Sequence, residues 1–397
     1  MPASRPHRRH FPMENRVAFL HQHIMSFTQY PARVIDEKGA NGTAPFPITF
    51  KRQTIGPFHI MIVVALHNSL YNGPMLKKQD APLQTPFQQM QAAVDIVHTS
   101  EHPHNKVAAT LFNERFSISC TNHWPEKIKE KIGTEKKIGN SSGTIHAETA
   151  CILNAPQATE DASLCITDPF CPNCAKNVAE AGVKTIYIDH KGFDKDFFKR
   201  RGEQFDTMSM QICEHAGISV YELRREDEKL VPILEVPYSY IPPEDSPIDM
   251  QPILKADDTL LRQLVQKAEK DHSRRKFAIA LARDNDSALF SLVARAHAVR
   301  GYSMSDPDEA LDLLTPIGKY SFIQEPVNRT LMFMARRGLK PEPGYFYCSQ
   351  VPTSREQVNL VGAGIKRITV GDFQRCRDPH GREAMRQLKD AGILRYN

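Results

Sequence analysis

Two short motifs constrain this chain more than any other feature: His146-Ala147-Glu148 and, downstream, Cys171-Pro172-Asn173-Cys174. One imidazole and two thiols form the kind of ligand set that Zn²⁺ prefers. Three protein ligands leave the fourth tetrahedral position open, which is typical of a catalytic zinc and not of a structural one. The motifs therefore predict a zinc centre held by His146, Cys171 and Cys174, with Glu148 as the catalytic residue that moves protons beside it.

The spacing within each motif predicts its place on a helix. If Cys171 begins the helix CPNCAKNVAEA, both thiols lie on one face of its first turn, where the helix N-terminus favours the thiolate. The side chains of His146 and Glu148 share no helical face, so they converge on one metal only at the very start of a helix. The alternatives are a redox cysteine pair and a four-ligand structural site, but the sequence holds no second C-x-x-C motif.

Composition bounds the class of protein. A chain of 397 residues with 41% hydrophobic and 24% charged residues is typical of a globular protein with about two or three domains. No apolar run approaches the roughly 18 residues of a membrane span, so we expect no membrane contact. The start, MPASRPHRRHFPMEN, lacks the apolar segment of a secretory signal. It is typical of a disordered basic N-terminus, with a mitochondrial presequence as the alternative.

Cysteine content and net charge indicate the compartment of the protein and the partners it can contact. Eight cysteines in 397 residues do not indicate a disulfide framework, and free thiol ligands require a reducing compartment, so we expect a cytoplasmic protein. The net charge of +5 permits contact with phosphate groups but is far below that of a dedicated nucleic-acid arm.

The pattern of elements predicts an α/β fold. From about residue 85 the expected order is helix, strand, strand, helix, strand, helix, strand, helix, strand, which gives a mixed five-stranded sheet with helices on both faces, a three-layer α/β/α arrangement. KVAATLF and FSISCTN are expected to form a hairpin, and a helix between the last two strands lets those strands run parallel.

Four segments are predicted along the chain. An N-terminal extension, 1–84, contains one strand-like run, FHIMIVVALH, and is otherwise partly disordered. The catalytic domain spans 85–225. Residues 226–254 hold so many prolines that we expect a stiff linker. Residues 255–397 form a second domain.

The second domain is predicted to be a degenerate copy of the first, so that the fold is present twice. The segment GYFYCSQVPTSREQVNLVGAGIKRITVGD (344–372) aligns without a gap with ASLCITDPFCPNCAKNVAEAGVKTIYIDH (162–190). In this alignment Thr353 and Glu356 replace the two cysteines, and EPVNRTLMFMARRG replaces the His146 helix and offers no histidine. The copy is therefore expected to bind no zinc. The alternative is a coincidental similarity between two β-α-β segments.

The two motifs together resemble the cytidine and deoxycytidylate deaminase superfamily, whose signature is H-x-E followed by P-C-x-x-C. The parallel final strands resemble its deoxycytidylate and tRNA adenosine deaminase branch. The resemblance implies a Zn²⁺-activated hydroxide that attacks the amino-bearing carbon of cytosine or adenine, with Glu148 as the proton shuttle. It further implies that the backbone N–H groups of Ala147 and Cys171 face the base.

The same resemblance suggests a substrate-binding set of Asn122, Ala147 and Phe170. Asn122, in CTNHWP, stands where the family holds a sugar hydroxyl, although an asparagine that caps a loop is an equally good interpretation. Phe170 precedes Cys171 where the family has proline, and a phenylalanine there is expected to reshape the pocket.

Three functions are compatible with these residues. The first is deamination of dCMP, CMP or cytidine with release of ammonia. The alternative is a base deaminase acting on tRNA, other RNA or single-stranded DNA, with the basic second copy as the binding platform. A scaffold with a vestigial zinc site is disfavoured because it has no use for Glu148. The second copy is expected to pair with the first within the chain, or the chain to form a homodimer. The sequence does not choose between cytosine and adenine.

Overall fold

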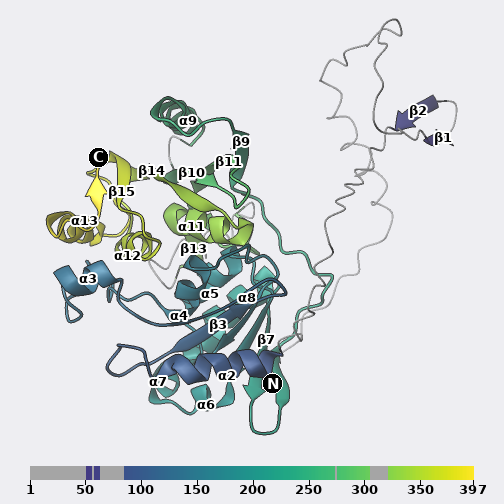
Figure 1. Ribbon diagram of the computed structural model, residues 1–397, viewed down its shortest axis with the longest axis vertical. Helices are drawn as coiled ribbons and strands as arrows, with labels where there is room; N and C mark the ends of the chain where they lie inside the picture. Colours follow the sequence, from purple (N-terminus) through teal and green to yellow (C-terminus); the bar gives the residue numbers. More distant parts are fainter. Residues whose placement is uncertain (1–50, 56–57, 63–84, 273–274, 305–320) are drawn as a thin grey trace, which may run out of the picture. The chain divides into compact units, whose positions relative to one another are not determined.

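The computed structural model describes residues 51–55, 58–62, 85–272, 275–304 and 321–397 (Figure 1). The chain divides into two compact units, Met1–Lys78 and Gln79–Asn397. In the first unit, β1 (Lys51–Ile55) and β2 (Phe58–Ile62) pair as antiparallel strands, and β2 coincides with the start of the expected strand. Apart from these two strands, the predicted extension lies outside the described residues.

The first large sheet belongs to the part of the chain that carries the motifs. Its strands are β3 (Ala108–Phe112), β4 (Ser117–Thr121), β5 (Ser163–Ile166), β6 (Thr185–Asp189), β7 (Ser219–Arg224) and β8 (Lys229–Leu234). The strand order is β4-β3-β5-β6-β7-β8. β3 pairs antiparallel with β4 and β5, whereas β5, β6 and β7 run parallel. The predicted hairpin and the parallel pair β6–β7 are confirmed.

Helices cover both faces of this sheet, which confirms the predicted three-layer α/β/α fold. They are α2 (Pro86–Val97), α3 (Glu126–Lys131), α4 (Ala147–Leu153), α5 (Pro172–Glu180), α6 (His190–Phe193), α7 (Asp196–Gln204) and α8 (Met210–Ala216), with one π-helical turn, η2 (Phe205–Ser209). Met90 of α2 packs with Phe112 and Cys165 on one face. Side chains that alternate with these, such as Leu111 and Leu164, belong to the core cluster that contains α4 and α5.

The second large sheet repeats this arrangement. Its strands are β9 (Asp249–Ile253), β10 (Phe277–Arg283), β11 (Leu289–Arg295), β14 (Lys340–Gln350), β15 (Arg367–Asp372) and β16 (Arg395–Tyr396), in the order β16-β15-β14-β10-β11-β9. β10 pairs antiparallel with β11 and β14, and β14, β15 and β16 run parallel. The five neighbouring strands β11, β10, β14, β15 and β16 thus follow the same order and directions as β4, β3, β5, β6 and β7.

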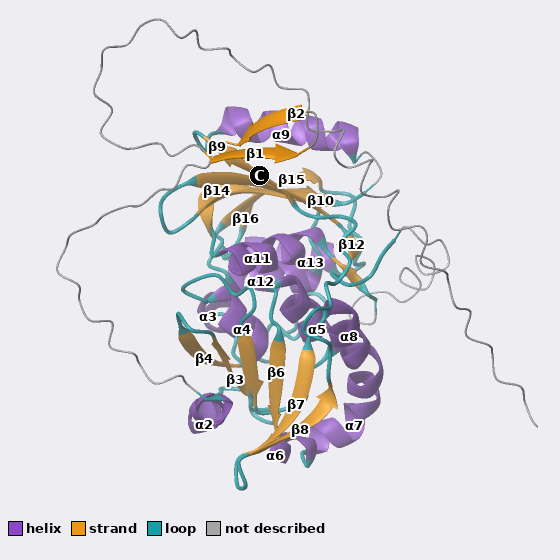
Figure 2. Ribbon diagram, turned by 90° about the vertical axis from the view of Figure 1, so that its right-hand side faces the viewer, coloured by secondary structure: helices purple, strands orange, loops and turns teal. Residues whose placement is uncertain are grey.

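The remaining elements of this region are α9 (Asp258–Asp271), α11 (Pro326–Arg337), α12 (Ser354–Gly362) and α13 (Gly381–Asp390), and two short paired strands, β12 (His297–Ala298) and β13 (Ile323–Gln324). We call residues 85–234 the first half and residues 249–397 the second half. Figure 2 shows α11 and α12 of the second half facing α4 and α5 of the first, so that helices lie between the two sheets.

Each sheet has six strands and not the predicted five. The sixth strand of each comes from the proline-rich segment 226–254, which supplies β8 to the first sheet and β9 to the second. Pro232 lies in β8 and Pro252 in β9. A proline lacks the N–H that a central strand must donate, and both strands are edge strands, paired only with β7 and with β11 respectively.

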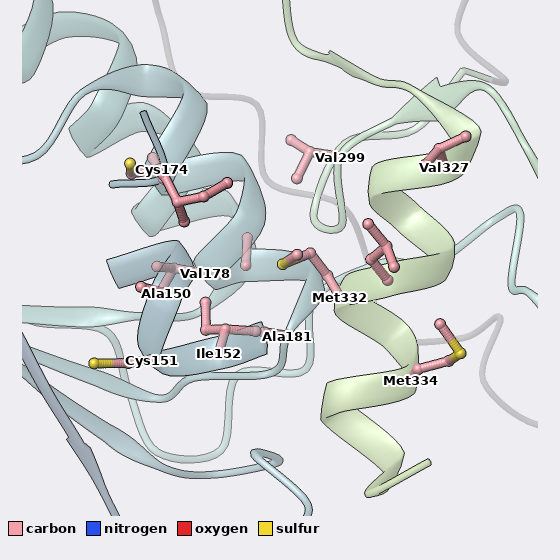
Figure 3. Packing of buried hydrophobic residues seen from close by; sticks show 14 of the residues in the cluster. Ala150, Cys151, Ile152, Cys174, Val178, Ala181, Val299, Val327, Met332 and Met334 are labelled. Atoms are coloured by element: carbon pink, nitrogen blue, oxygen red, sulfur yellow. The ribbon is translucent and has the colours of Figure 1, made fainter. Parts of the chain in front are cut away.

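The two halves share one hydrophobic core. Figure 3 shows Met332 of α11 directed toward the helical segment that carries Val178 and Ala181. All three side chains are buried and belong to a single cluster that includes residues from both sheets. Polar contacts join the halves as well, because the Lys176 ammonium on α5 donates to the Ser321 and Ile323 carbonyl oxygens at 2.9 and 3.1 Å. No helix within the described ranges is long and apolar enough to cross a membrane.

Candidate active site

The structure brings the three predicted ligands together. The Nδ1 atom of His146 lies 3.2 Å from Sγ of Cys174 and 3.7 Å from Sγ of Cys171. The three ligand atoms all lie within 4.8 Å of one another, close enough to surround one metal ion. The assignment of these residues as ligands rests on this geometry and on the chemistry of the donor set.

Helix starts produce this convergence, as the spacing predicts. His146 is the N-cap of α4 and Cys171 the N-cap of α5, and both have extended backbone angles just before their helices begin. Pro172 occupies the first helical position, where its missing N–H costs nothing. Because Cys174 lies one turn further along α5, its thiol points to the same side as that of Cys171.

Glu148 lies in the first turn of α4 and is only 3% exposed. Burial raises the pKa of its carboxyl group to about 7, although the neighbouring His146 lowers it. A carboxyl group with a pKa near neutrality accepts and returns a proton with little free-energy cost in either direction. Its position beside the three ligand atoms suits a proton carrier better than a fourth ligand.

Electrostatics at the cluster favour a metal-binding thiolate. A hydrogen bond from Cys174, together with the charge of His146, lowers the pKa of the Cys171 thiol well below its usual value, although burial raises it. The N-terminus of α5 acts in the same direction.

A cavity of about 1610 Å³ opens at this cluster. Its first-half lining comes from the segments 102–107, 137–148, 168–176 and 194–196 and from Asn122. Its second-half lining comes from the segments 321–328 and 353–379. The second half is therefore part of the wall of the cavity that holds the candidate metal site.

Asn122 lines this cavity, but its amide is largely engaged in bracing a loop. Its Oδ1 atom accepts hydrogen bonds from the Ser100 hydroxyl at 2.7 Å and from the Val107 N–H at 2.9 Å, and its Nδ2 donates to the Asn105 carbonyl at 2.8 Å. These contacts correspond to the loop-capping interpretation. A contact with a sugar hydroxyl stays a prediction.

Ala147 and Phe170 also line the cavity. The Ala147 N–H begins α4, where first-turn N–H groups have no partner within the helix. The Phe170 ring is 3% exposed and meets the ring of Phe205 edge-on, with centroids 5.5 Å apart. The Phe170 carbonyl accepts a hydrogen bond from the Ser209 hydroxyl at 3.1 Å. Phe170 therefore ties the loop before Cys171 to the π-helical turn η2.

Sequence reasoning missed several residues of the cavity wall. Arg355 on α12 donates to the Thr144 carbonyl and lies 3.4 Å from the Ser142 hydroxyl, across the boundary between the halves. Arg377 donates to Glu325 at 2.8 Å on the same wall. No local motif marks Arg355, because its neighbours in space are more than two hundred residues away in sequence.

Comparison with known proteins agrees with this geometry. Residues 84–190 match the family described as the cytidine and deoxycytidylate deaminase zinc-binding region. This part of the chain is therefore similar to the cytidine and deoxycytidylate deaminase superfamily. An uncharacterized deaminase in the luxG 3' region of Aliivibrio fischeri is 27% identical to this chain over 122 residues, which are 30% of this chain and 81% of that protein.

Two crystal structures of dCMP deaminase from the cyanophage S-TIM5, one in complex with dCMP and dUMP and one in apo form, are also similar to this chain. Each is 20% identical with a TM-score of 0.25. The matches cover 34% and 35% of this chain and 93% and 96% of those chains.

The zinc-binding region of the deaminase family and the His146, Cys171 and Cys174 cluster identify Zn²⁺ as the cofactor. The donor set fits, because one imidazole and two thiols with a depressed thiol pKa are the ligands that zinc selects. Among the described residues, this is the one group of histidine, cysteine or carboxylate side chains with such geometry.

We expect the purified protein to contain about one zinc per chain. Changing Cys174 to Ser should lower the zinc content to a small fraction of this, because a hydroxyl is a far poorer zinc ligand than a thiolate. Elemental analysis after dialysis measures the content. Cys376→Ser is the matched control, since this half-buried thiol lies in the second half. Retention of zinc by Cys174→Ser would show that other residues hold the metal.

Proposed function

We propose that this chain is a zinc-dependent hydrolytic deaminase that converts a cytosine nucleotide or nucleoside to its uracil form and releases ammonia. The observation that carries the proposal is the buried Glu148 beside the His146, Cys171 and Cys174 cluster at the floor of a large cavity. A structural metal site held by His146, Cys171 and Cys174 has no need of a buried carboxyl group beside it. A hydrolytic site needs that group as its proton carrier.

Each residue has a role in the proposed reaction. Zinc held by His146, Cys171 and Cys174 would supply a water whose pKa is lowered to about 7. Glu148 would take one proton from the attacking water and deliver it to the ring nitrogen N3, and would then take the proton of the new C4 hydroxyl and deliver it to the departing amino group. The N–H groups of Ala147 and Cys171 donate toward the oxygen of the base. Water thus adds at C4, the bond from C4 to the amino nitrogen breaks, and ammonia leaves.

A phosphate-bearing substrate is favoured over a free nucleoside because Arg355 lines the same cavity. Its contacts are the Thr144 carbonyl and the Ser142 hydroxyl, and no carboxylate pairs with it in the part of the chain that the structure describes. Such a guanidinium has no carboxylate beside it to compete with an anion, and guanidinium groups bind phosphate in a bidentate manner. We therefore assign the substrate's phosphate to Arg355.

A single-stranded nucleic acid is the second candidate substrate. The cavity volume of about 1610 Å³ exceeds the range of roughly 300–1,000 Å³ typical of small-molecule sites. It leaves room for nucleotides on either side of the reacting base. Arg355 would bind a phosphate of either candidate substrate. The two candidates are therefore distinguished by comparing turnover of mononucleotides with turnover of oligonucleotides.

The test is a panel of cytidine, deoxycytidine, CMP, dCMP and short RNA and single-stranded DNA oligonucleotides, each assayed for ammonia release. We expect turnover of a cytosine mononucleotide to exceed that of the matching nucleoside. Turnover of oligonucleotides alone would favour the second candidate. Ammonia from none of these substrates, with zinc bound, would refute the proposed function.

Arg355→Met is expected to lower kcat/KM for the mononucleotide by about 10- to 100-fold, because the variant loses a hydrogen bond to the charged phosphate and such a bond contributes about this much. Turnover of the nucleoside should change little, because the nucleoside has no phosphate. Arg375→Met is the control, since this arginine of the second half is exposed and lies outside the cavity. An equal loss on nucleoside and nucleotide would assign Arg355 to the support of the Thr144 loop instead.

A further inference from the structure

The second half contains a counterpart of the metal site at the starts of its own helices. Glu325 is the N-cap of α11 as His146 is the N-cap of α4, and Thr353 is the N-cap of α12 as Cys171 is that of α5. The gapless alignment places Glu356 opposite Cys174. The three positions that converge on the zinc site thus carry Glu325, Thr353 and Glu356 in the second half.

A lysine ammonium lies where these side chains converge. Nζ of Lys276 is 2.6 Å from Oε2 of Glu356 and 3.1 Å from Oε2 of Glu325. The Lys276 side chain is 4% exposed and that of Glu356 is fully buried. Burial alone lowers the pKa of an amine, but the two carboxylates more than offset it and raise the pKa of Lys276. The ammonium is therefore charged and held by two anions.

Glu356 connects the two helix starts. Its Oε1 atom accepts a hydrogen bond from the Val327 N–H in the first turn of α11 at 2.9 Å, and its Oε2 accepts one from the Thr353 N–H at 2.7 Å. Lys276 immediately precedes β10, which begins at Phe277. A cation, two anions and two helix N-termini thus form one closed cluster that joins α11 and α12.

We propose that Lys276 is a built-in replacement for the metal of the second half, an ammonium that fills a former cation centre and joins α11 to α12 without any bound ion. In the first half, by comparison, α4 and α5 are joined at their starts through ligands that need a metal. The proposal concerns the second half alone and holds whatever reaction the first half performs.

The cluster also reaches the cavity of the first half. Glu325 accepts a hydrogen bond from Arg377 at 2.8 Å through Oε1, while its Oε2 faces Lys276. Both Glu325 and Arg377 line the cavity. The two cations balance the two carboxylates, so that the cluster is neutral. Lys276 is therefore a positioning residue for this wall of the cavity.

The first experiment compares Lys276→Met with the triple variant Lys276→Met/Glu325→Gln/Glu356→Gln. Removing only the lysine leaves two buried carboxylates without their cation, and we expect the Tm to fall by roughly 10 °C. Removing all three charges should recover part of this loss. Lys255→Met is the control, because Lys255 forms an exposed pair with Asp257 at 3.4 Å. A loss no larger than that of Lys255→Met would overturn the proposal.

The second experiment asks whether the site accepts a metal once the lysine is gone. Lys276→Ala leaves two carboxylates and the Thr353 hydroxyl, an oxygen ligand set that suits Mn²⁺, Mg²⁺ or Ca²⁺. We expect millimolar MnCl₂ to raise the Tm of Lys276→Ala but not that of Lys276→Ala/Glu356→Gln. Failure of Mn²⁺ to stabilise Lys276→Ala would contradict the equivalence with a cation centre.

Wild-type protein provides a readout that does not depend on the folding of any variant. With Lys276 in place, the second half should take up no divalent metal, so that wild-type protein incubated with excess Zn²⁺ or Mn²⁺ and then desalted retains only the metal of the first half. A second tightly bound metal per chain that is lost in Glu325→Gln/Glu356→Gln would overturn the proposal.

Discussion

Replacing Glu148 with glutamine is expected to lower kcat for deamination about 10³-fold while the zinc content stays unchanged. Glutamine has nearly the same shape as glutamate and fits the same buried position, but its amide cannot take up and return a proton. The loss should appear in kcat more than in KM, because the proton moves during the reaction and not during binding. Ammonia release at saturating substrate and elemental analysis of the same sample measure the two quantities.

Glu126→Gln is the control for this change, since it makes the same substitution on the exposed first turn of α3. It should leave both activity and zinc content at the wild-type level. If Glu148→Gln instead lost its zinc, the carboxylate would be a ligand and the proposed division of roles at the site would be wrong. If it kept full activity with its zinc, another group would carry the proton.

The sequence predicted the metal cluster because its information is local. The spacing of Cys171 and Cys174 matches one turn of a helix, and the structure places Cys171 at the N-cap of α5 as that spacing requires. His146 likewise begins α4. The layered α/β fold followed from the order of elements, since a helix between two strands lets them run parallel.

The wall of the cavity could not be predicted in the same way. Arg355 meets the Thr144 loop only because α12 packs beside the first half, and no periodicity in the sequence encodes that contact. The alignment correctly placed Thr353 at a helix start, yet it gave no sign that Lys276 closes the charge cluster from another strand. Long-range pairing of this kind depends on how the two sheets stack, which local patterns do not specify.

The proline-rich segment shows a different limit. Its prolines disfavour helix and central strand, and this reasoning held, but it did not predict that the segment would add an edge strand to each sheet. An edge strand needs hydrogen bonds on one side only, so that Pro232 fits within β8. A segment that cannot form a central strand can therefore still form an edge strand.

Gly301→Ala is expected to cost about 3–5 kcal/mol of the free energy of unfolding. Gly301 has φ +98°, a backbone conformation that residues with a side chain rarely adopt. An added Cβ would lie 2.1 Å from the carbonyl oxygen of His215. The clash is with backbone of the first half, at the end of α8, which cannot move aside as a flexible side chain would. The neighbouring Tyr302 ring stacks on His215 at 4.2 Å, so the change also disturbs this contact between the halves. Chemical denaturation measures the loss.

Gly364→Ala separates conformational strain from the clash. Gly364 has a similarly positive φ of +74° but nothing within 4 Å of an added Cβ, so it should lose only about 1–2 kcal/mol. The difference between the two losses therefore reports the cost of the clash between the added Cβ and the His215 carbonyl. Because one core joins the two halves, both should unfold in a single transition in either variant. Equal losses would show that Gly301 does not approach α8 in solution, and two separate transitions would show that the first half folds without the second.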